Sequence, residues 1–298
     1  MLKYIFVDDT LPCMELEYLR QNLSKDGTVE VEMIAEKDLP GDSLVISHDL
    51  RLLNMAKERG AATVCYLPPE GSQASGEVPS PEGSQMSVEV SPLEEQTVSG
   101  ANPDMYVEGF EEVDFPFLNR VYQRHHGIPW TILTTERCIV KEFSMEYLDA
   151  LFELYAGEGM TDYVEPLYPY EKEREYQESY IRYMYGFYGY GMWIVCDRES
   201  GKLIGRAGVE HREELGDELE LGYAISVDYQ KKGYATEVCT AILAYARDEL
   251  GYQRVNCLIE HGNQVSVHLA EKLGFAYQGE MPVGEKTMMR YVKELAQE

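Results

Sequence analysis

Residues 220–235 read ELGYAISVDYQKKGYA, and this stretch decides the fold of the second half of the chain. An apolar strand is expected over 219–227, and apolar residues three or four positions apart predict an amphipathic helix over 234–250. Such a helix points the free N–H groups of its first turn, and the positive end of its dipole, into the preceding loop. Lys231 and Lys232 add positive charge there, and Gly233 allows a ligand to approach closely. The loop is therefore an expected anion site.

Three blocks around this loop carry a family resemblance. Gln230-Lys231-Lys232-Gly233-Tyr234-Ala235 matches the Gln/Arg-x-x-Gly-x-Gly/Ala pyrophosphate loop of the GNAT superfamily of N-acetyltransferases. It follows Glu220-Leu221-Gly222-Tyr223-Ala224-Ile225 and precedes Asn263-Gln264-Val265-Ser266 and Glu271-Lys272-Leu273-Gly274-Phe275, in the family's order and spacing. Residues 131–295 resemble most the branch that contains ribosomal-protein N-terminal acetyltransferases. The resemblance implies an α+β GNAT fold, a mixed and mostly antiparallel sheet flanked by helices.

The resemblance also implies the reaction, which is direct attack of a primary amine on the thioester of acetyl-CoA, with no metal. The loop would bind the pyrophosphate, and the backbone of the preceding strand would bind the pantetheine arm and supply an oxyanion N–H. The cofactor-binding residues implied in this way are Tyr223, Ala224, Ile225, Gln230, Lys231, Lys232, Gly233, Tyr234, Ala235, Asn263 and Ser266.

Two residues are candidates for catalysis. Alternation along 219–227 puts Glu220 on a face with small side chains, which we expect to be open, so Glu220 is a candidate general base acting through water. The alternative is a solvated or ion-paired strand glutamate. The family usually has a tyrosine acid where Ala270 stands, and Ser266, one helical turn earlier, matches the serine of the ribosomal-protein branch. Ser266 either hydrogen-bonds the sulfur of CoA or satisfies backbone groups at the start of the helix near Asn263. Asn263 itself is expected to be the N-cap of that helix, a ligand of the pantetheine arm, or both.

The amine acceptor is expected to meet a tyrosine-rich region. Ten of the 23 tyrosines lie between Tyr155 and Tyr190, in the part of the family that covers the substrate cleft. Such a stripe is either core packing or, with Glu158, Asp162 and Glu165, a cleft for a cationic amine. The tyrosines in question include Tyr163, Tyr168, Tyr170, Tyr176, Tyr180 and Tyr183.

The N-terminal part has a different pattern, in which short apolar strands alternate with helices. This pattern predicts a small Rossmann-like α/β module with Asp8, Asp9 and Ser47-His48-Asp49 at the carboxyl ends of its strands. Residues 45–49, with the helix and strand after them, resemble the closing part of haloacid-dehalogenase-like domains. Thr10 stands where that family has its second aspartate, so the resemblance implies a degenerate site with a structural or binding role.

A low-complexity segment interrupts this module. Residues 68–105 are rich in Pro, Gly, Ser and Glu and repeat Pro-Glu-Gly-Ser-Gln at 69 and 81, which predicts a disordered loop. The expected domains are therefore 1–128, the module with its loop, and 131–298, the acetyltransferase.

Composition narrows the partners. The net charge of −27 argues against a nucleic-acid partner. The expected anion loop is a local positive site in an otherwise acidic chain. No apolar run long enough to span a membrane and no signal peptide is recognised, so we expect a cytoplasmic monomer or homodimer with reduced cysteines. The expected function is an acetyl-CoA-dependent N-acetyltransferase acting on a small-molecule or peptide amine. The alternatives are a non-catalytic acyl-CoA-binding sensor and phosphohydrolysis at Asp8 and Asp9.

Overall fold

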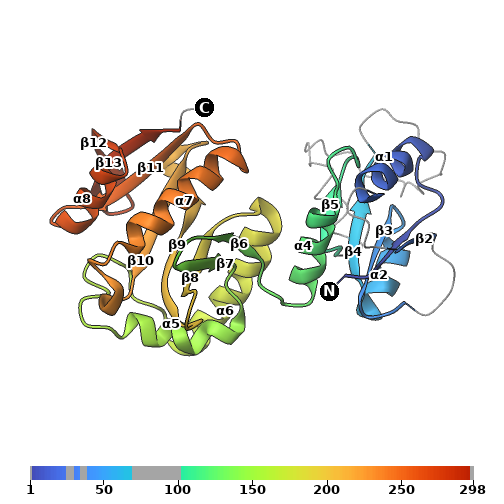
Figure 1. Ribbon diagram of the computed structural model, residues 1–298, viewed down its shortest axis with the longest axis horizontal. Helices are drawn as coiled ribbons and strands as arrows, with labels where there is room; N and C mark the ends of the chain where they lie inside the picture. The colour runs from blue at the N-terminus through green and yellow to red at the C-terminus, as the bar shows by residue number, and fades with distance from the viewer. Residues whose placement is uncertain (1, 25–29, 34–38, 69–101, 296–298) are drawn as a thin grey trace, which may run out of the picture. The chain divides into compact units, whose positions relative to one another are not determined.

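The computed structural model describes residues 2–24, 30–33, 39–68 and 102–295 (Figure 1). The chain divides into two units, Met1–Ile128 and Pro129–Glu298, which we call unit 1 and unit 2. Most of the expected loop, 69–101, lies outside the described residues. Its last residues, 102–105, have a defined structure, because the Asp104 carboxylate accepts hydrogen bonds from Thr63 and Lys57.

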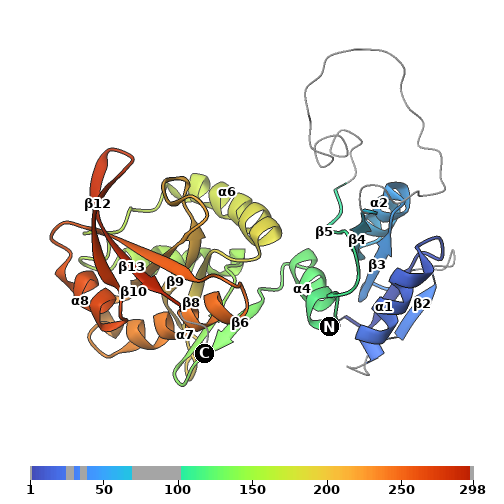
Figure 2. The same cartoon turned by 90° about the horizontal axis from the view of Figure 1, so that it is seen from above.

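Unit 1 is built on a parallel sheet whose strand order is β2-β1-β3-β4-β5. Successive side chains of the central strands alternate between two cores. Ile5 and Ile46 belong to a cluster with residues of α1 and α4, whereas Phe6 and Val45 belong to a cluster with Leu53 on α2. Figure 2 shows these three helices beside the sheet. The elements in chain order are β1 Tyr4–Val7, α1 Cys13–Ser24, β2 Glu30–Met33, β3 Ser43–Ser47, α2 Leu50–Glu58, β4 Ala62–Tyr66, β5 Met105–Val107 and α4 Phe115–His125.

The strand order of unit 1 contains a topological switch point. The chain leaves β1 for β2 on one side and returns to β3 on the other, which places the switch point at the carboxyl ends of β1 and β3. The predicted alternation of strands and helices is present.

Unit 2 contains an eight-stranded mixed sheet with the order β12-β13-β11-β10-β9-β8-β7-β6. Every neighbouring pair is antiparallel except β10 and β11, which are parallel. The strands are β6 Thr131–Thr134, β7 Cys138–Lys141, β8 Met192–Asp197, β9 Leu203–His211, β10 Leu219–Ile225, β11 Arg254–Glu260, β12 Ala276–Val283 and β13 Lys286–Glu294. The helices are η2 Met145–Tyr147, α5 Leu148–Tyr155, α6 Tyr170–Tyr180, η3 Ile181–Tyr188, η4 Glu213–Leu215, η5 Val227–Tyr229, α7 Tyr234–Asp248 and α8 Gln264–Lys272.

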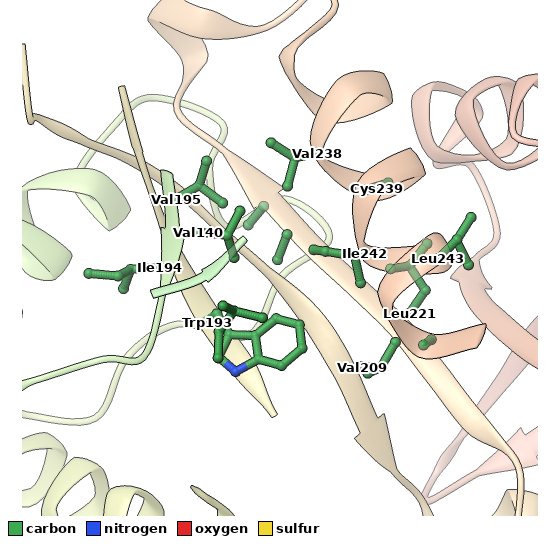
Figure 3. Packing of buried hydrophobic residues seen from close by; sticks show 14 of the residues in the cluster. Val140, Trp193, Ile194, Val195, Val209, Leu221, Val238, Cys239, Ile242 and Leu243 are labelled. Carbon is green, nitrogen blue, oxygen red and sulfur yellow. The ribbon is translucent and has the colours of Figure 1, made fainter. Parts of the chain in front are cut away.

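The core of unit 2 lies mainly between the sheet and α7. Val209 on β9 and Leu221 on β10 face the apolar stripe of α7, which includes Val238 and Ile242 (Figure 3). Fully buried side chains at the predicted three- and four-residue spacing explain why this segment is helical. The opposite face of β9 carries Arg206, whose neighbours are tyrosines of α5, α6 and η3.

In unit 2 the strand expected over 219–227 is β10, which ends at Ile225, and the helix expected over 234–250 is α7, which ends at Asp248. The strand β6, whose alternation is short and weak, was not expected. The helix that begins at Tyr170 changes to a π-helix at Ile181 and ends at Tyr188. All six cysteines are free thiols; five are buried and Cys13 is exposed.

Candidate functional site

The sheet of unit 2 opens between its two parallel strands. β10 and β11 pair only at Leu219 with Val255 and at Glu220 with Asn256, and then diverge. β10 continues to Ile225 and β11 to Glu260, each still paired with its other neighbour, β9 or β13. In the described part of the chain no strand pairs with residues 221–225 on the β11 side. This wedge offers a row of backbone groups to an extended ligand.

A loop of unusual backbone conformation stands at the open end of the wedge. Lys231, with φ 58°, and Gly233, with φ 87°, both adopt the left-handed conformation. The first helical hydrogen bond of α7 runs from the Glu237 N–H to the Gly233 carbonyl over 3.0 Å, so the N–H groups of 234–236 precede the helical ladder. The side-chain amide of Gln230 donates through Nε2 to the Ile225 carbonyl over 2.9 Å and holds the loop against β10. The expected anion loop therefore has the geometry of an anion-binding concavity.

Arg137 braces this loop and was not singled out from the sequence. Its side chain donates to both the Glu237 carboxylate and the Lys232 carbonyl, at 2.6 and 3.0 Å, and its guanidinium lies 4.1 Å from the centre of the Tyr234 ring. Arg137 and Glu237 are 100 residues apart, and only the fold brings them together. No local signal in the sequence could have identified Arg137.

The loop residues fit a phosphate-bearing ligand such as CoA. Lys231, Lys232 and Gly233 are exposed, while Glu237, the acidic residue of the first helical turn, is held by Arg137. A Cβ at Gly233 would lie 3.4 Å from Arg137 Nη2 and would occupy part of the space in front of the loop. Positive side chains and free N–H groups thus converge where the backbone is most accessible.

The second flank of the wedge is α8. Asn263 is its N-cap, since Asn263 Oδ1 accepts the Ser266 N–H over 3.1 Å. The Tyr223 hydroxyl donates to the Ser266 carbonyl over 3.5 Å and links β10 to α8. Ala270, in the tyrosine position of the family, is fully buried. The structure therefore brings Tyr223, Asn263 and Ser266 together beside the wedge.

Glu220 lies at the vertex of the wedge but not on an open face, so that expectation is wrong. Glu220 and Ala224 are both buried, because α5 and α6 bring tyrosines over this side of the sheet. The Glu220 carboxylate forms an ion pair with Arg212, and the Leu258 N–H also donates to it, from the part of β11 that no longer pairs with β10. Burial raises the pKa of Glu220 above its usual value, although Arg212 opposes the shift.

The tyrosine-rich segment divides into two groups. Tyr180 and Tyr185 are buried, as core packing requires, whereas a second group is exposed, namely Tyr163, Tyr168, Tyr170, Tyr176 and Tyr183. A Cβ at Gly262, beyond the end of β11, would lie 3.3 Å from the Tyr163 hydroxyl. Glu158, Asp162 and Glu165 are exposed on the same connection between α5 and α6.

The polar residues at the strand ends of unit 1 also meet. Asp8 is buried and accepts hydrogen bonds from the Ser47 hydroxyl at 2.6 Å and from the Thr10 N–H and hydroxyl at 3.0 and 2.7 Å. His48 Nδ1 lies 3.5 Å from the Thr10 hydroxyl. Asp9 is exposed, and Asp49 caps α2 by accepting the Arg51 N–H. The Asp8 carboxylate and the donors of Ser47 and Thr10 thus meet one another's need for hydrogen-bond partners.

The described ranges, 2–24, 30–33, 39–68 and 102–295, contain no cluster of three or more His, Cys, Asp and Glu side chains arranged to hold a metal ion. They also contain no helix that is long and apolar enough to cross a membrane.

Unit 2 thus combines a mixed sheet that opens between parallel strands with a loop of positive side chains at the end of one of them. Residues 137–276 match the family model described as "Acetyltransferase (GNAT) domain". Over this range unit 2 is similar to the GNAT family of acetyltransferases. The resemblance of unit 1 to haloacid-dehalogenase-like domains finds no support in these comparisons.

Three relatives show how far the likeness extends. Uncharacterized protein YkkB of Bacillus subtilis is 31% identical over 110 residues, which are 37% of this chain and 60% of the relative. The putative ribosomal N-acetyltransferase YdaF of Bacillus subtilis is 30% identical over 80 residues, 27% of this chain and 44% of the relative. The spermidine N(1)-acetyltransferase of Escherichia coli is 26% identical over 113 residues, 38% of this chain and 59% of the relative. The chain thus spans about half the length of these relatives.

Proposed function

We propose that the protein is an N-acetyltransferase that moves an acetyl group from acetyl-CoA to a primary amine. The observation that carries the proposal is the wedge between β10 and β11, which ends at a positively charged loop with free N–H groups. The domain assignment behind it is 131–298 for the transferase and 1–128 for an appended Rossmann-like module.

The chain's own groups divide into those that hold the co-substrate and those that act on it. Lys231, Lys232, Gly233 and the first N–H groups of α7 would hold the diphosphate, with Gln230, Tyr234 and Ala235 shaping the loop. The backbone of Tyr223, Ala224 and Ile225, with Asn263 and Ser266, would hold the pantetheine arm. From Ile225 back to Glu220 is five residues, or about 17 Å of strand, so an arm extended along β10 ends near Glu220. Acetyl-CoA supplies the activated acetyl group.

Transfer needs a base, an oxyanion donor and a proton for the leaving thiolate. Glu220 takes a proton from the amine, directly or through water, and the nitrogen lone pair forms a bond to the acetyl carbon while the C–S bond breaks. A backbone N–H of 223–225 stabilises the negative charge on the carbonyl oxygen. Ser266 hydrogen-bonds the departing sulfur.

The acceptor is proposed to be cationic. YdaF is named as a putative ribosomal acetyltransferase and another relative acts, by its name, on spermidine, so a peptide N-terminus and a polyamine are the first acceptors to test. The exposed Glu158, Asp162 and Glu165 and the charge of −27 favour a cation. The closest likeness is proposed to be to the ribosomal-protein branch, on the strength of Ser266 in place of the usual tyrosine.

Calorimetry of the full chain with acetyl-CoA tests the co-substrate, and mass spectrometry of a panel of amines tests transfer. We expect saturable binding and acetylation of at least one cationic amine. Glu220→Gln and Ser266→Ala should lower kcat with little change in acetyl-CoA affinity. Failure to bind acetyl-CoA would refute the proposal, while binding without transfer to any amine would favour the sensor alternative.

A further inference from the structure

A second carboxylate faces Glu220 across the strand pair. In the antiparallel ladder of β9 and β10, Glu210 is directly opposite Glu220, so both side chains lie on the same face of the sheet. Side chains in direct register have Cβ atoms only about 5 Å apart, and like charges in that position repel. Two carboxylates at one register position therefore require an explanation.

Neither carboxylate is free to turn away. The Tyr180 hydroxyl donates to Glu210, and the same hydroxyl accepts the Met192 N–H over 2.6 Å, which fixes it between α6 and β8. Tyr180 is itself buried. A Cβ at Gly191 would lie only 2.6 Å from the Tyr180 hydroxyl, so the glycine at this position leaves space for the hydroxyl to reach Glu210. Glu210 is held in place from a different element of the fold.

Arg212 interacts with more than one carboxylate. It forms the ion pair with Glu220, and both Glu210 and the exposed Glu214 act on it electrostatically. Burial raises the pKa of Glu220, and without Glu210 the Arg212 charge would oppose more of that rise and make Glu220 a weaker proton acceptor. The negative charge of Glu210 acts in the opposite direction.

The other groups around Glu220 do not supply a negative charge that would oppose Arg212 in place of Glu210. From β11, Asn256 is uncharged and donates to Glu218 and the Leu219 carbonyl, the Leu258 N–H favours the ionised carboxylate, and Cys257 is a buried thiol whose pKa is raised. Tyr180 reaches Glu220 only through Glu210. Arg206, two positions before Gly208 on the same face of β9, is buried among tyrosines.

We propose that Glu210 is a positioning residue for Glu220: held by Tyr180 across the strand pair, its charge offsets Arg212 and keeps Glu220 able to accept the proton of the acceptor amine. This inference rests on the proposed function and adds a residue that neither the motif nor the family match identifies. It needs no further reactant, because the proton moves only from the amine to Glu220.

Two substitutions with opposite signs test it. Glu210→Gln removes the like charge and retains an acceptor for the Tyr180 hydroxyl, so the acidic limb of the kcat/KM profile should move about one unit to lower pH. Arg212→Gln removes the favourable charge and should move the same limb to higher pH. Glu213→Gln, an exposed change of equal charge nearby, is the matched control and should leave the profile unchanged.

Glu210→Asp separates charge from shape. It keeps the charge but shortens the reach to Tyr180, so the proposal expects an unshifted limb, whereas a purely structural role expects Asp to be as damaging as Gln. The proposal is overturned if the acidic limb of the kcat/KM profile stays at the same pH in both Glu210→Gln and Arg212→Gln, or if it moves in the same direction in both.

A readout without substrate distinguishes this inference from the proposed function. Carbon-13 NMR titration of glutamate carboxyl groups, with Glu220 assigned from the Glu220→Gln difference, measures its ionisation in the absence of acetyl-CoA and acceptor. We expect the same opposite shifts in Glu210→Gln and Arg212→Gln. Shifts without any transfer activity would refute the proposed function and leave the coupling intact, while activity without the shifts would refute the coupling.

Discussion

The two units each gather polar groups at the end of a strand, but with opposite results. In unit 1, the Asp8 carboxylate, beyond β1, is fully used by donors from Ser47 and Thr10. In unit 2, the loop beyond β10 leaves N–H groups in front of the helical ladder of α7. A set of buried polar groups that satisfy one another stabilises a fold, whereas donors left exposed at a helix N-terminus can bind an anion.

The largest expected effect is on the loop of unit 2. Lys231→Glu combined with Lys232→Glu reverses the charge of both lysines of the loop while leaving its backbone intact. Loss of two charge-assisted contacts should weaken acetyl-CoA binding about 100-fold, or about 2.7 kcal/mol, measured by calorimetry of the full chain.

Lys172→Glu together with Lys202→Glu is the matched control, since both lysines are exposed and lie elsewhere in unit 2, on α6 and in the turn between β8 and β9. It makes the same change in net charge and should alter the affinity only slightly. Equal losses in both double variants would show that overall charge, not the loop, controls binding.

A change in unit 1 should affect stability instead of binding. Asp8→Asn replaces a carboxylate oxygen by an NH₂ group that faces donors, and should destabilise unit 1 by about 2 kcal/mol. Hydrogen exchange in peptides from β1 and β3 measures this, while both tryptophans, Trp130 and Trp193, report unit 2 by fluorescence. Asp9→Asn, at the exposed neighbouring position, should have little effect.

The pH dependence of unit 1 follows from the same carboxylate. Burial opposes ionisation of Asp8, but the hydrogen bonds from Ser47 and Thr10 outweigh it and lower its pKa below the ordinary 3.8. A carboxyl group with a lowered pKa contributes stability above 3.8, and this contribution is lost as the pH falls through the folded-state value. The wild type should lose protection in β1 below about pH 4 more steeply than Asp8→Asn; equal slopes would contradict this assignment.

A smaller effect is expected where the loop is braced. Arg137→Gln removes the contact to the Lys232 carbonyl and the ion pair with Glu237, so the loop loses its support without losing its own charges. Acetyl-CoA affinity should fall about tenfold. Arg182→Gln, at an exposed position on η3, should leave it unchanged. An unaffected Arg137→Gln would mean that Gln230 and the backbone hold the loop alone.

The same comparison shows what the sequence could and could not predict. The loop of unit 2 was predictable, because the lysines, the glycine and the start of the helix lie within six residues and act locally. Arg137 and Glu210 were not, since each reaches the site through strand pairing or a side-chain contact with a distant segment. For Glu220, period-two alternation predicts which residues share a face but not which helices cover it. The expected open face was therefore wrong.

The smallest expected effect separates two roles of Asn263, the residue where a structural and a ligand-binding contact meet. Asn263→Ala removes the cap of α8 and should cost unit 2 about 1 kcal/mol in urea unfolding followed by tryptophan fluorescence. Asn263→Ser can still accept the Ser266 N–H, so it should recover most of that stability. If the side-chain amide also binds the pantetheine arm, Asn263→Ser should nevertheless bind acetyl-CoA about fivefold more weakly than wild type. Full recovery of both stability and affinity would place Asn263 with Asp8, as a residue whose polar group serves the fold alone.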